Sequence, residues 1–197
     1  MKWQFSLGFL GLVFVGSAHA DNRQRVFATY PETASALTLR RTRADFAQGR
    51  ALLFGIDGVP RSFATASAYL RGAAAQHYAP AQTLIGLMYA KGDGVSQDDR
   101  TALHWYRLAA QQGYARAEID LGDMYAEGRG ISSDLVHAYA WYASAKADSM
   151  LGSLSWRDAS GRIAKLDSRM SPAQIATAQQ LVARRRETER NDGSLVP

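Results

Sequence analysis

Apolar residues recur along the middle of the chain in a pattern that repeats after 36 residues. Sliding the stretch 81–116 forward by that offset places glycine on glycine, methionine on methionine and aromatic on aromatic residues. A fixed period of about 20 to 50 residues indicates a solenoid, in which each unit buries its apolar face against its neighbours. The matched pairs are Gly86 and Gly122, Met88 and Met124, Tyr89 and Tyr125, Gly92 and Gly128, Gly94 and Gly130, Asp98 and Asp134, Ala102 and Ala138, Trp105 and Trp141, Tyr106 and Tyr142, and Ala109 and Ala145.

Each copy of the pattern predicts a helix, a turn and a second helix. Apolar residues recur at helical spacing from 84 to 89 and again from 102 to 109, so each half offers one apolar stripe. Gly92 and Gly94 favour positive φ in the turn, and Asp98 falls near the first turn of the second helix, where a carboxylate suits the helix dipole. A glycine pair can also hold phosphate, but no Gly-Lys-Ser/Thr follows it here, and the pair recurs in the second copy.

These residues resemble the Sel-one-like repeat (SLR), a relative of the tetratricopeptide repeat (TPR). The resemblance is carried by 84–115 and its echo at 120–145, and with a weaker first copy it covers about half of the chain. It implies an all-α fold, namely a right-handed, TPR-like α-solenoid of helix-turn-helix repeats whose concave face binds other proteins. Members of the family are mostly adaptors in bacterial envelope, signalling and exopolysaccharide systems.

The chain divides into repeats and flanking segments. The first repeat is degenerate, as expected for a terminal unit with one face in water. Its matches to the second repeat include Ala66 with Ala102, Tyr69 with Trp105 and Tyr78 with Tyr114. The predicted organisation is a signal peptide at 1–20, a flexible lead-in at 21–35, repeats at 36–80, 81–116 and 117–150, capping helices at 151–190 and a tail at 191–197.

The C-terminal segment predicts two capping helices and a basic end. An amphipathic stretch from 149 to 168, which includes Leu151 and Leu154, is expected to cover the last repeat. Ser171, followed by Pro172 and then Gln174, has the pattern of a capping box that starts a helix. The charged run 184–197 is interpreted either as a contact for anionic polymer or lipid headgroups, or as a frayed and solvated helix end.

The first residues have the pattern of an exported protein. Lys2 precedes a mostly apolar run that ends with Ala18, His19 and Ala20, as in a cleaved secretory signal peptide. A retained membrane anchor is the alternative, but the run is short for a bilayer, which needs about 17 residues or more. The chain contains no cysteine, so it has neither a lipid-modified cysteine nor a disulfide. We therefore expect a periplasmic or secreted protein without a membrane span.

Charge is distributed unevenly along the chain. Bases and acids number six and three in 21–50, eight and ten in 51–150, and eight and five in 151–197. A nucleic-acid-binding protein concentrates bases on its binding surface, whereas here the repeats are the acidic part and the ends are basic. We expect no nucleic-acid partner.

The sequence predicts no enzyme, cofactor or metal site. His77, His104 and His137 have no partner at metal-ligand spacing. The Ser-x-x-Lys and Lys-Thr-Gly signatures of penicillin-recognising enzymes are absent. A cysteine-rich branch of the resembled family is linked to penicillin binding, and this chain lacks those cysteines. Asp120 and Asp123 are more simply explained as solvated surface groups than as a catalytic pair. The repeated tyrosines and tryptophans are interpreted as contacts between helices rather than as a sugar-stacking surface.

Two functions remain open on the sequence. The first is an exported, non-enzymatic adaptor that binds another envelope protein in the concave face. The second is a carbohydrate-associated module that binds peptidoglycan or an acidic exopolysaccharide through its basic ends. By analogy with tetratricopeptide hairpins, the exposed, protein-binding positions of the concave face are expected at Arg50, Thr83, Leu87, Lys91, Ile119, Asp123 and Glu127.

Overall fold

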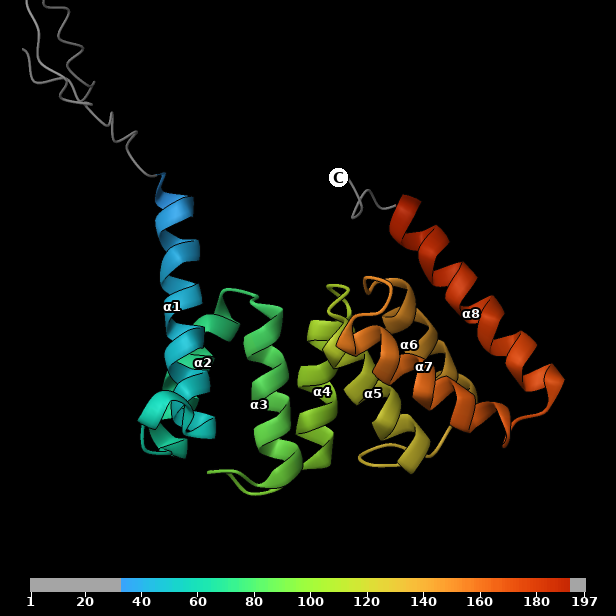
Figure 1. Ribbon diagram of the computed structural model, residues 1–197, viewed down its shortest axis with the longest axis horizontal. Helices are drawn as coiled ribbons and strands as arrows, with labels where there is room; N and C mark the ends of the chain where they lie inside the picture. The colour runs from blue at the N-terminus through green and yellow to red at the C-terminus, as the bar shows by residue number, and fades with distance from the viewer. Residues whose placement is uncertain (1–32, 192–197) are drawn as a thin grey trace, which may run out of the picture. The chain divides into compact units, whose positions relative to one another are not determined.

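The computed structural model describes residues 33–191, in which every regular element is helical (Figure 1). The predicted signal peptide, most of the lead-in and most of the tail lie outside these residues. None of the helices described has the length and hydrophobicity that a membrane span requires. The elements are α1 (Ala34–Phe54), the short 3-10 helix η1 (Ile56–Gly58), α2 (Phe63–Ala75), α3 (Ala79–Lys91), α4 (Asp99–Ala110), α5 (Ala115–Glu127), α6 (Leu135–Ala147), α7 (Leu154–Asp167) and α8 (Pro172–Asn191).

The helices pack as three successive pairs, and the predicted all-α solenoid is confirmed. α1 packs on α2, α3 on α4 and α5 on α6, and each pair contacts the next through α2 with α3 and α4 with α5. Figure 1 shows these helices following one another in chain order. Each core is therefore shared by neighbouring repeats, which is why one repeat cannot fold alone.

A glycine in each first helix lets the second helix of the same repeat approach closely. A Cβ on Gly86 would lie 2.8 Å from the Tyr106 ring, and one on Gly122 would lie 2.5 Å from the Tyr142 ring. Both tyrosines are buried. The repeated glycine and tyrosine in the sequence are thus two halves of one packing contact.

The turns and caps follow the sequence prediction. Gly92 and Gly94 have φ of 76° and 75°, the left-handed conformation that glycine adopts without strain. Asp98 is the N-cap of α4 and accepts hydrogen bonds from the backbone N–H groups of Arg100 and Thr101. The Thr101 hydroxyl also donates to Asp98 at 2.6 Å and lowers the pKa of that carboxyl, which therefore stays charged at the positive end of the helix.

Two further helices cover the last repeat. α7 and α8 both pack on α6. The predicted capping box is present, because the Ser171 backbone N–H donates to Gln174 Oε1 at 2.8 Å and the Gln174 N–H donates to Ser171 Oγ at 3.3 Å. Leu166 is buried as expected, but Leu151 and Leu154 are 84% and 75% exposed. Their predicted role in covering the repeat is wrong, because α7 begins only at Leu154 and turns a different face toward α6.

Candidate partner-binding groove

The first helices of the three repeats surround an open groove with a volume of about 450 Å³. We call it the α1/α3/α5 groove. Each helix contributes residues from the side that is not packed against its own second helix. The lining residues are Phe46, Arg50 and Phe54 from α1, Pro80, Thr83, Leu84, Leu87 and Lys91 from α3, Tyr114, which caps the start of α5, and Arg116 and Asp120 from α5.

Repeat geometry explains why these residues meet. Side chains four residues apart share one face of a helix, so Arg50 and Phe54 lie on one side of α1 while Leu87 and Lys91 lie on one side of α3. Because Gly49 of α1 occupies the place of Gly86 in α3, Arg50 is in register with Leu87 and Phe54 is in register with Lys91. A cation in one helix is therefore matched by an apolar side chain in the other.

Apolar side chains form much of the groove. Phe54 is 46% exposed, an unusual state for a large aromatic residue. Phe46 is packed edge-on against Tyr78, with ring centroids 5.1 Å apart. The Arg50 guanidinium carbon lies 6.0 Å from the centroid of the Phe46 ring. This surface can bury apolar groups of a ligand without any rearrangement of the protein core.

The charges of the groove are only partly balanced within the protein. Arg116 binds Asp120 through two contacts of 3.1 Å, and its other nitrogen lies 3.9 Å from Asp158. Burial raises the pKa of Asp120, and the charge of Arg116 opposes that rise. Arg50 and Lys91 are exposed and form no ion pair with any residue in 33–191.

The Tyr114 hydroxyl lies near two of the groove's cations, Arg50 and Arg116. Burial raises the pKa of its hydroxyl, while the charges of Arg116 and Arg50, from two different repeats, act in the opposite direction. The charged residues that line the groove are three cations, Arg50, Lys91 and Arg116, and one acid, Asp120, so the lining carries a net positive charge.

The structure brings together four of the seven residues predicted for the concave face. Arg50, Thr83, Leu87 and Lys91 all line the groove. Thr83, however, is only 4% exposed, and its hydroxyl donates to the Ala79 carbonyl oxygen at 2.9 Å, so it belongs to the floor. The expectation of an exposed side chain is wrong for Thr83.

The three predicted residues of the third repeat do not line the groove. Ile119 is 0% exposed and packs in the core with Tyr142 and Leu166, so its predicted exposure is also wrong. The equivalent residue of α3, Thr83, is buried as well, so this position of the repeat faces the packed core in both helices.

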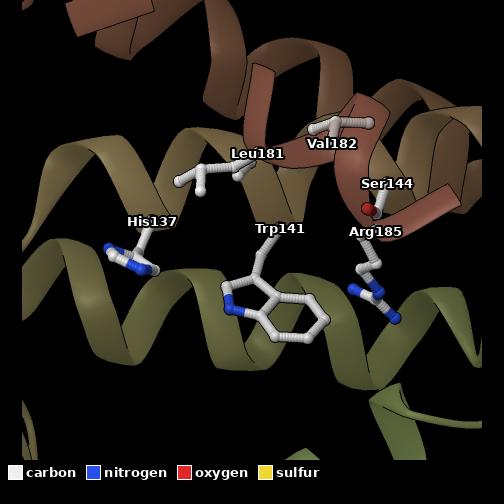
Figure 2. A pocket seen from close by; sticks show the side chains of 7 residues that line it. His137, Trp141, Ser144, Leu181, Val182 and Arg185 are labelled. Atoms are coloured by element: carbon white, nitrogen blue, oxygen red, sulfur yellow. The ribbon is translucent and has the colours of Figure 1, made fainter. Parts of the chain in front are cut away.

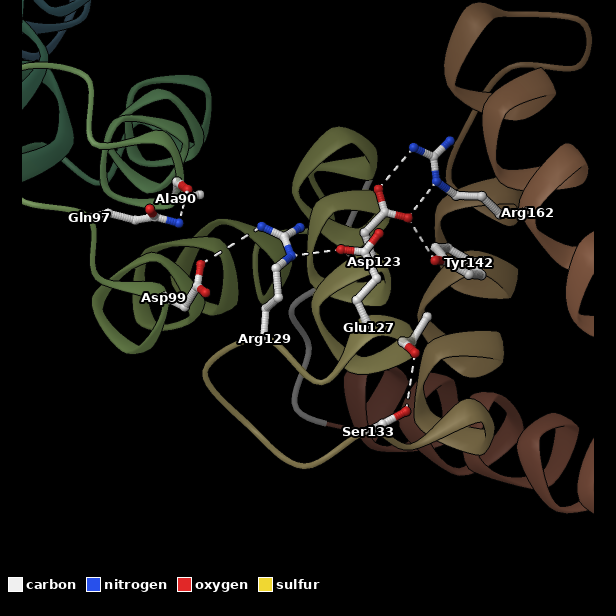
Figure 3. A network of polar contacts seen from close by, with 10 residues as sticks. Ala90, Gln97, Asp99, Asp123, Glu127, Arg129, Ser133, Tyr142 and Arg162 are labelled. Carbon is white, nitrogen blue, oxygen red and sulfur yellow. Dashed lines mark hydrogen bonds and ion pairs between the residues drawn. The ribbon is translucent and has the colours of Figure 1, made fainter.

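Asp123 and Glu127 are engaged within the protein. Arg162 of α7 donates two hydrogen bonds to Asp123, at 2.6 and 2.9 Å, and the Tyr142 hydroxyl donates a third at 2.7 Å. Figure 3 shows the Asp123 carboxylate between these two partners. Glu127 accepts a hydrogen bond from Arg129 at 2.7 Å. Asp123 therefore joins the last repeat to its cap, and its interpretation as a solvated surface group is wrong.

Sequence reasoning missed several lining residues. Phe46 and Phe54 flank Arg50 at a spacing of four, and this spacing could have identified them once the first repeat was aligned through its glycine. Tyr114 was recognised as a repeat position, but its place at the mouth of the groove depends on where α5 begins. Arg116 and Asp120 form an i, i+4 pair that the sequence alone does not orient.

A second, smaller cavity of about 120 Å³ marks the contact between α6 and α8 (Figure 2). Figure 2 shows the indole of Trp141 between His137 and Arg185. The Arg185 guanidinium carbon lies 4.1 Å from the centroid of the Trp141 ring, and Arg185 donates to the Ala110 carbonyl oxygen at 2.9 Å. The same group lies 3.2 Å from the carboxylate of Glu118, which is fully buried.

These contacts correct the interpretation of the basic C-terminal run. α8 continues to Asn191, Arg185 is packed into the repeats, and Arg186 lies 3.4 Å from Asp148. Of the three consecutive arginines, only Arg184 is exposed and forms no ion pair with a described side chain. Within its described part, 184–191, the run is neither a frayed end nor a uniformly free basic surface, because two arginines attach α8 to the solenoid, and 192–197 lie outside the described residues.

Known proteins share this architecture. A protective antigen of uropathogenic Escherichia coli that displays an SLR fold is 25% identical, with a TM-score of 0.65 over 79% of this chain and 33% of the antigen. A Sel1 repeat protein from Oxalobacter formigenes is 32% identical, with a TM-score of 0.54 over 66% of this chain and 94% of that protein. The chain thus spans about a third of the length of the antigen. No curated protein matches it.

The repeats themselves give the assignment. The Sel1 repeat matches residues 44–78, 79–114 and 115–148, which together make up more than half of the chain. These three segments correspond to the helix pairs α1/α2, α3/α4 and α5/α6. The chain therefore belongs to the Sel1 repeat family.

Proposed function

We propose that the protein is an exported, non-enzymatic adaptor that binds a segment of another envelope protein in the α1/α3/α5 groove. Sel1 repeat proteins generally mediate protein–protein interactions, and the family is typically a non-catalytic scaffold. The observation that carries the proposal is the groove, in which the exposed Phe54 and the half-buried Leu87 lie beside two cations that have no ion-pair partner within 33–191. Small apolar surfaces with a few polar groups are what protein grooves offer to peptides.

The groove supports this proposal better than the carbohydrate alternative. That alternative needs free basic ends, and at the C-terminal end Arg185 and Arg186 instead bind Glu118 and Asp148 within the protein. In the groove, Lys91 forms no ion pair with a described residue, and Leu87 and Phe54 are apolar.

Photo-crosslinking in living cells tests the proposed binding surface. A photoreactive amino acid at position 87 lies in the groove, and one at position 107 lies on the exposed side of α4 and serves as the control. We expect a discrete crosslinked species from position 87 alone, and we expect co-expression of the protein without the photoreactive residue to reduce it. Equal crosslinking from both positions, or none from position 87, would contradict the proposal.

Export is tested separately. The proposal requires cleavage after Ala20, because the first residues have the signal-peptide pattern. Intact-mass measurement of the protein recovered from a periplasmic fraction should give a chain that begins at Asp21. Recovery of a chain that begins at Met1 in the cytosol would refute export while leaving groove binding to be decided by the crosslinks.

A further inference from the structure

The α1/α3/α5 groove carries information about the chemistry of its occupant. Its surface is apolar at Phe54 and Leu87, and its two uncompensated charges, Arg50 and Lys91, are both positive. The α5 side of the groove adds no unpaired charge, because Arg116 is bound to Asp120 and approaches Asp158. The positive groove is notable because residues 51–150 carry ten acids and eight bases.

The placement of the two cations gives the pattern of the ligand. Arg50 is in register with Leu87 and Lys91 with Phe54, so each cation has an apolar neighbour across the groove. Because Lys91 is in register with Phe54, it lies about one helical turn further along the groove than Arg50. A ligand that satisfies all four residues must therefore present acidic and large apolar side chains in alternation.

Physical arguments favour an acidic partner over a neutral or basic one. Arg50 lies 6.0 Å from the Phe46 ring, so a carboxylate that binds it enters a partly apolar surrounding where attraction between charges is stronger than in open water. A basic segment would face two cations with no carboxylate free to receive it. Complementary charge of this kind sets partner choice and the rate of encounter more than total affinity.

The groove also has a closed end. At the position equivalent to Leu87, the third repeat has Asp123, which is held by Arg162 of α7. A ligand that continued along the first helices would meet this ion pair, in which both charges are already satisfied. The binding surface is therefore confined to the first two repeats and the start of α5.

The geometry points to a protein segment with alternating acidic and large apolar residues as the occupant, provided that the groove is the binding surface proposed above. An acidic polysaccharide shares the negative charge but lacks large apolar side chains to cover Phe54 and Leu87. The segment is expected to bind in an extended form across α1 and α3, with its carboxylates at Arg50 and Lys91.

Fluorescence anisotropy with the full chain tests this inference. The probes are fluorescein-labelled peptides in which Glu and Asp alternate with Leu and Phe. Matched peptides replace the acids with Lys or the apolar residues with Ser, and alginate serves as an anionic polymer competitor. We expect only the acidic and apolar peptide to bind, and we expect its affinity to fall as salt screens the two cations.

Charge reversal identifies the cations. The double variant Arg50→Glu with Lys91→Glu should weaken binding of the acidic peptide by about tenfold or more and should gain affinity for the Lys-containing peptide. The control, Arg71→Glu with Arg184→Glu, makes the same change of net charge on exposed positions of α2 and α8 and should leave binding unchanged. Circular dichroism melting of both variants shows whether they are folded, and the gained affinity cannot arise from unfolding.

The outcomes separate the inference from the proposed function. If Ser-substituted or Lys-containing peptides bind the wild-type groove as well as the acidic one, or if alginate alone binds and depends on Arg50 and Lys91, the inferred chemistry is overturned. Crosslinking from position 87 to a cellular protein would still support the adaptor in that case. If no peptide binds and position 87 gives no crosslink, both the inference and the proposed function fail.

Discussion

Arg50, Leu87 and Asp123 occupy the same position in the three repeats, but they differ in which parts of the protein pack against them. In the first two repeats, Arg50 and Leu87 face the open groove, and Arg50 has no ion-pair partner in the described chain. In the third repeat, the equivalent Asp123 is enclosed by Tyr142 and Arg162. The helices that carry these positions all end at a glycine with positive φ, so the difference comes from what packs beside them.

This difference shows how a repeat protein can use one position for two purposes. A solenoid needs a cap where its last repeat would otherwise expose a core, and this cap uses polar as well as apolar contacts. Glu118, Asp123 and Asp148 each pair with an arginine of α7 or α8. The open end keeps its cations unpaired, which is the state that a binding surface requires.

The largest effect is expected from removing the arginine that fixes the closed end. Arg185→Ala removes the ion pair with the fully buried Glu118, and breaking such a pair costs about 3 kcal/mol of the free energy of unfolding. Urea denaturation followed by circular dichroism measures the loss. Arg184→Ala, at the exposed neighbouring position, should change stability by less than about 0.5 kcal/mol. Equal stability of the two variants would show that α8 is not held by this contact.

A smaller loss is expected from the glycine contact that both ends share. Gly122→Ala places a Cβ 2.5 Å from the Tyr142 ring and should cost about 2 kcal/mol, because the tyrosine must move within a packed core. Gly161→Ala in α7 is the control, since its Cβ meets nothing within 4 Å, and it should stabilise the helix by about 0.5 kcal/mol. Thermal melting of the two variants should shift in opposite directions. A shift of the same sign in both would contradict the close approach of α5 and α6.

The ion pair that joins the last repeat to its cap is expected to contribute less. Asp123→Asn removes the charge that accepts two hydrogen bonds from Arg162 and should cost about 1 kcal/mol, because the pair is partly exposed to water. Asp158→Asn, whose contact with Arg116 is 3.9 Å long and half exposed, should have almost no effect. Chemical denaturation of both variants tests the ranking. If Asp158→Asn proved the more damaging, the closed end would depend on a different part of α7.

The smallest effect on stability is expected at the open end. Lys91→Ala removes an exposed side chain with no ion pair among the described residues and should change the free energy of unfolding by less than about 0.5 kcal/mol. The measurement is again urea denaturation, alongside Arg185→Ala. A loss above about 1 kcal/mol at Lys91 would remove the distinction between the two ends, because the lysine would then be part of the fold.

The sequence by itself determined the repeat, its turns and its caps. The positive φ of Gly92, the N-cap at Asp98 and the box formed by Ser171 and Gln174 all depend on a few neighbouring residues, so local chemistry suffices to predict them. The glycine-to-tyrosine contact was also present in the sequence as a repeated pair. Nearest-neighbour packing in a solenoid makes such features recur at the same period.

Only the tertiary structure decided which equivalent positions are open to a partner. The bond from Arg162 to Asp123 spans 39 residues and that from Arg185 to Ala110 spans 75, and neither follows from the repeat period. The repeat predicted the same exposure for Leu87 and Asp123, yet α7 reaches only the second of them. Exposure depends on which segments pack together. The helices α7 and α8, which lie outside the repeat pattern, cover the third repeat and leave Arg50 and Lys91 of the first two repeats without an ion pair among the described residues.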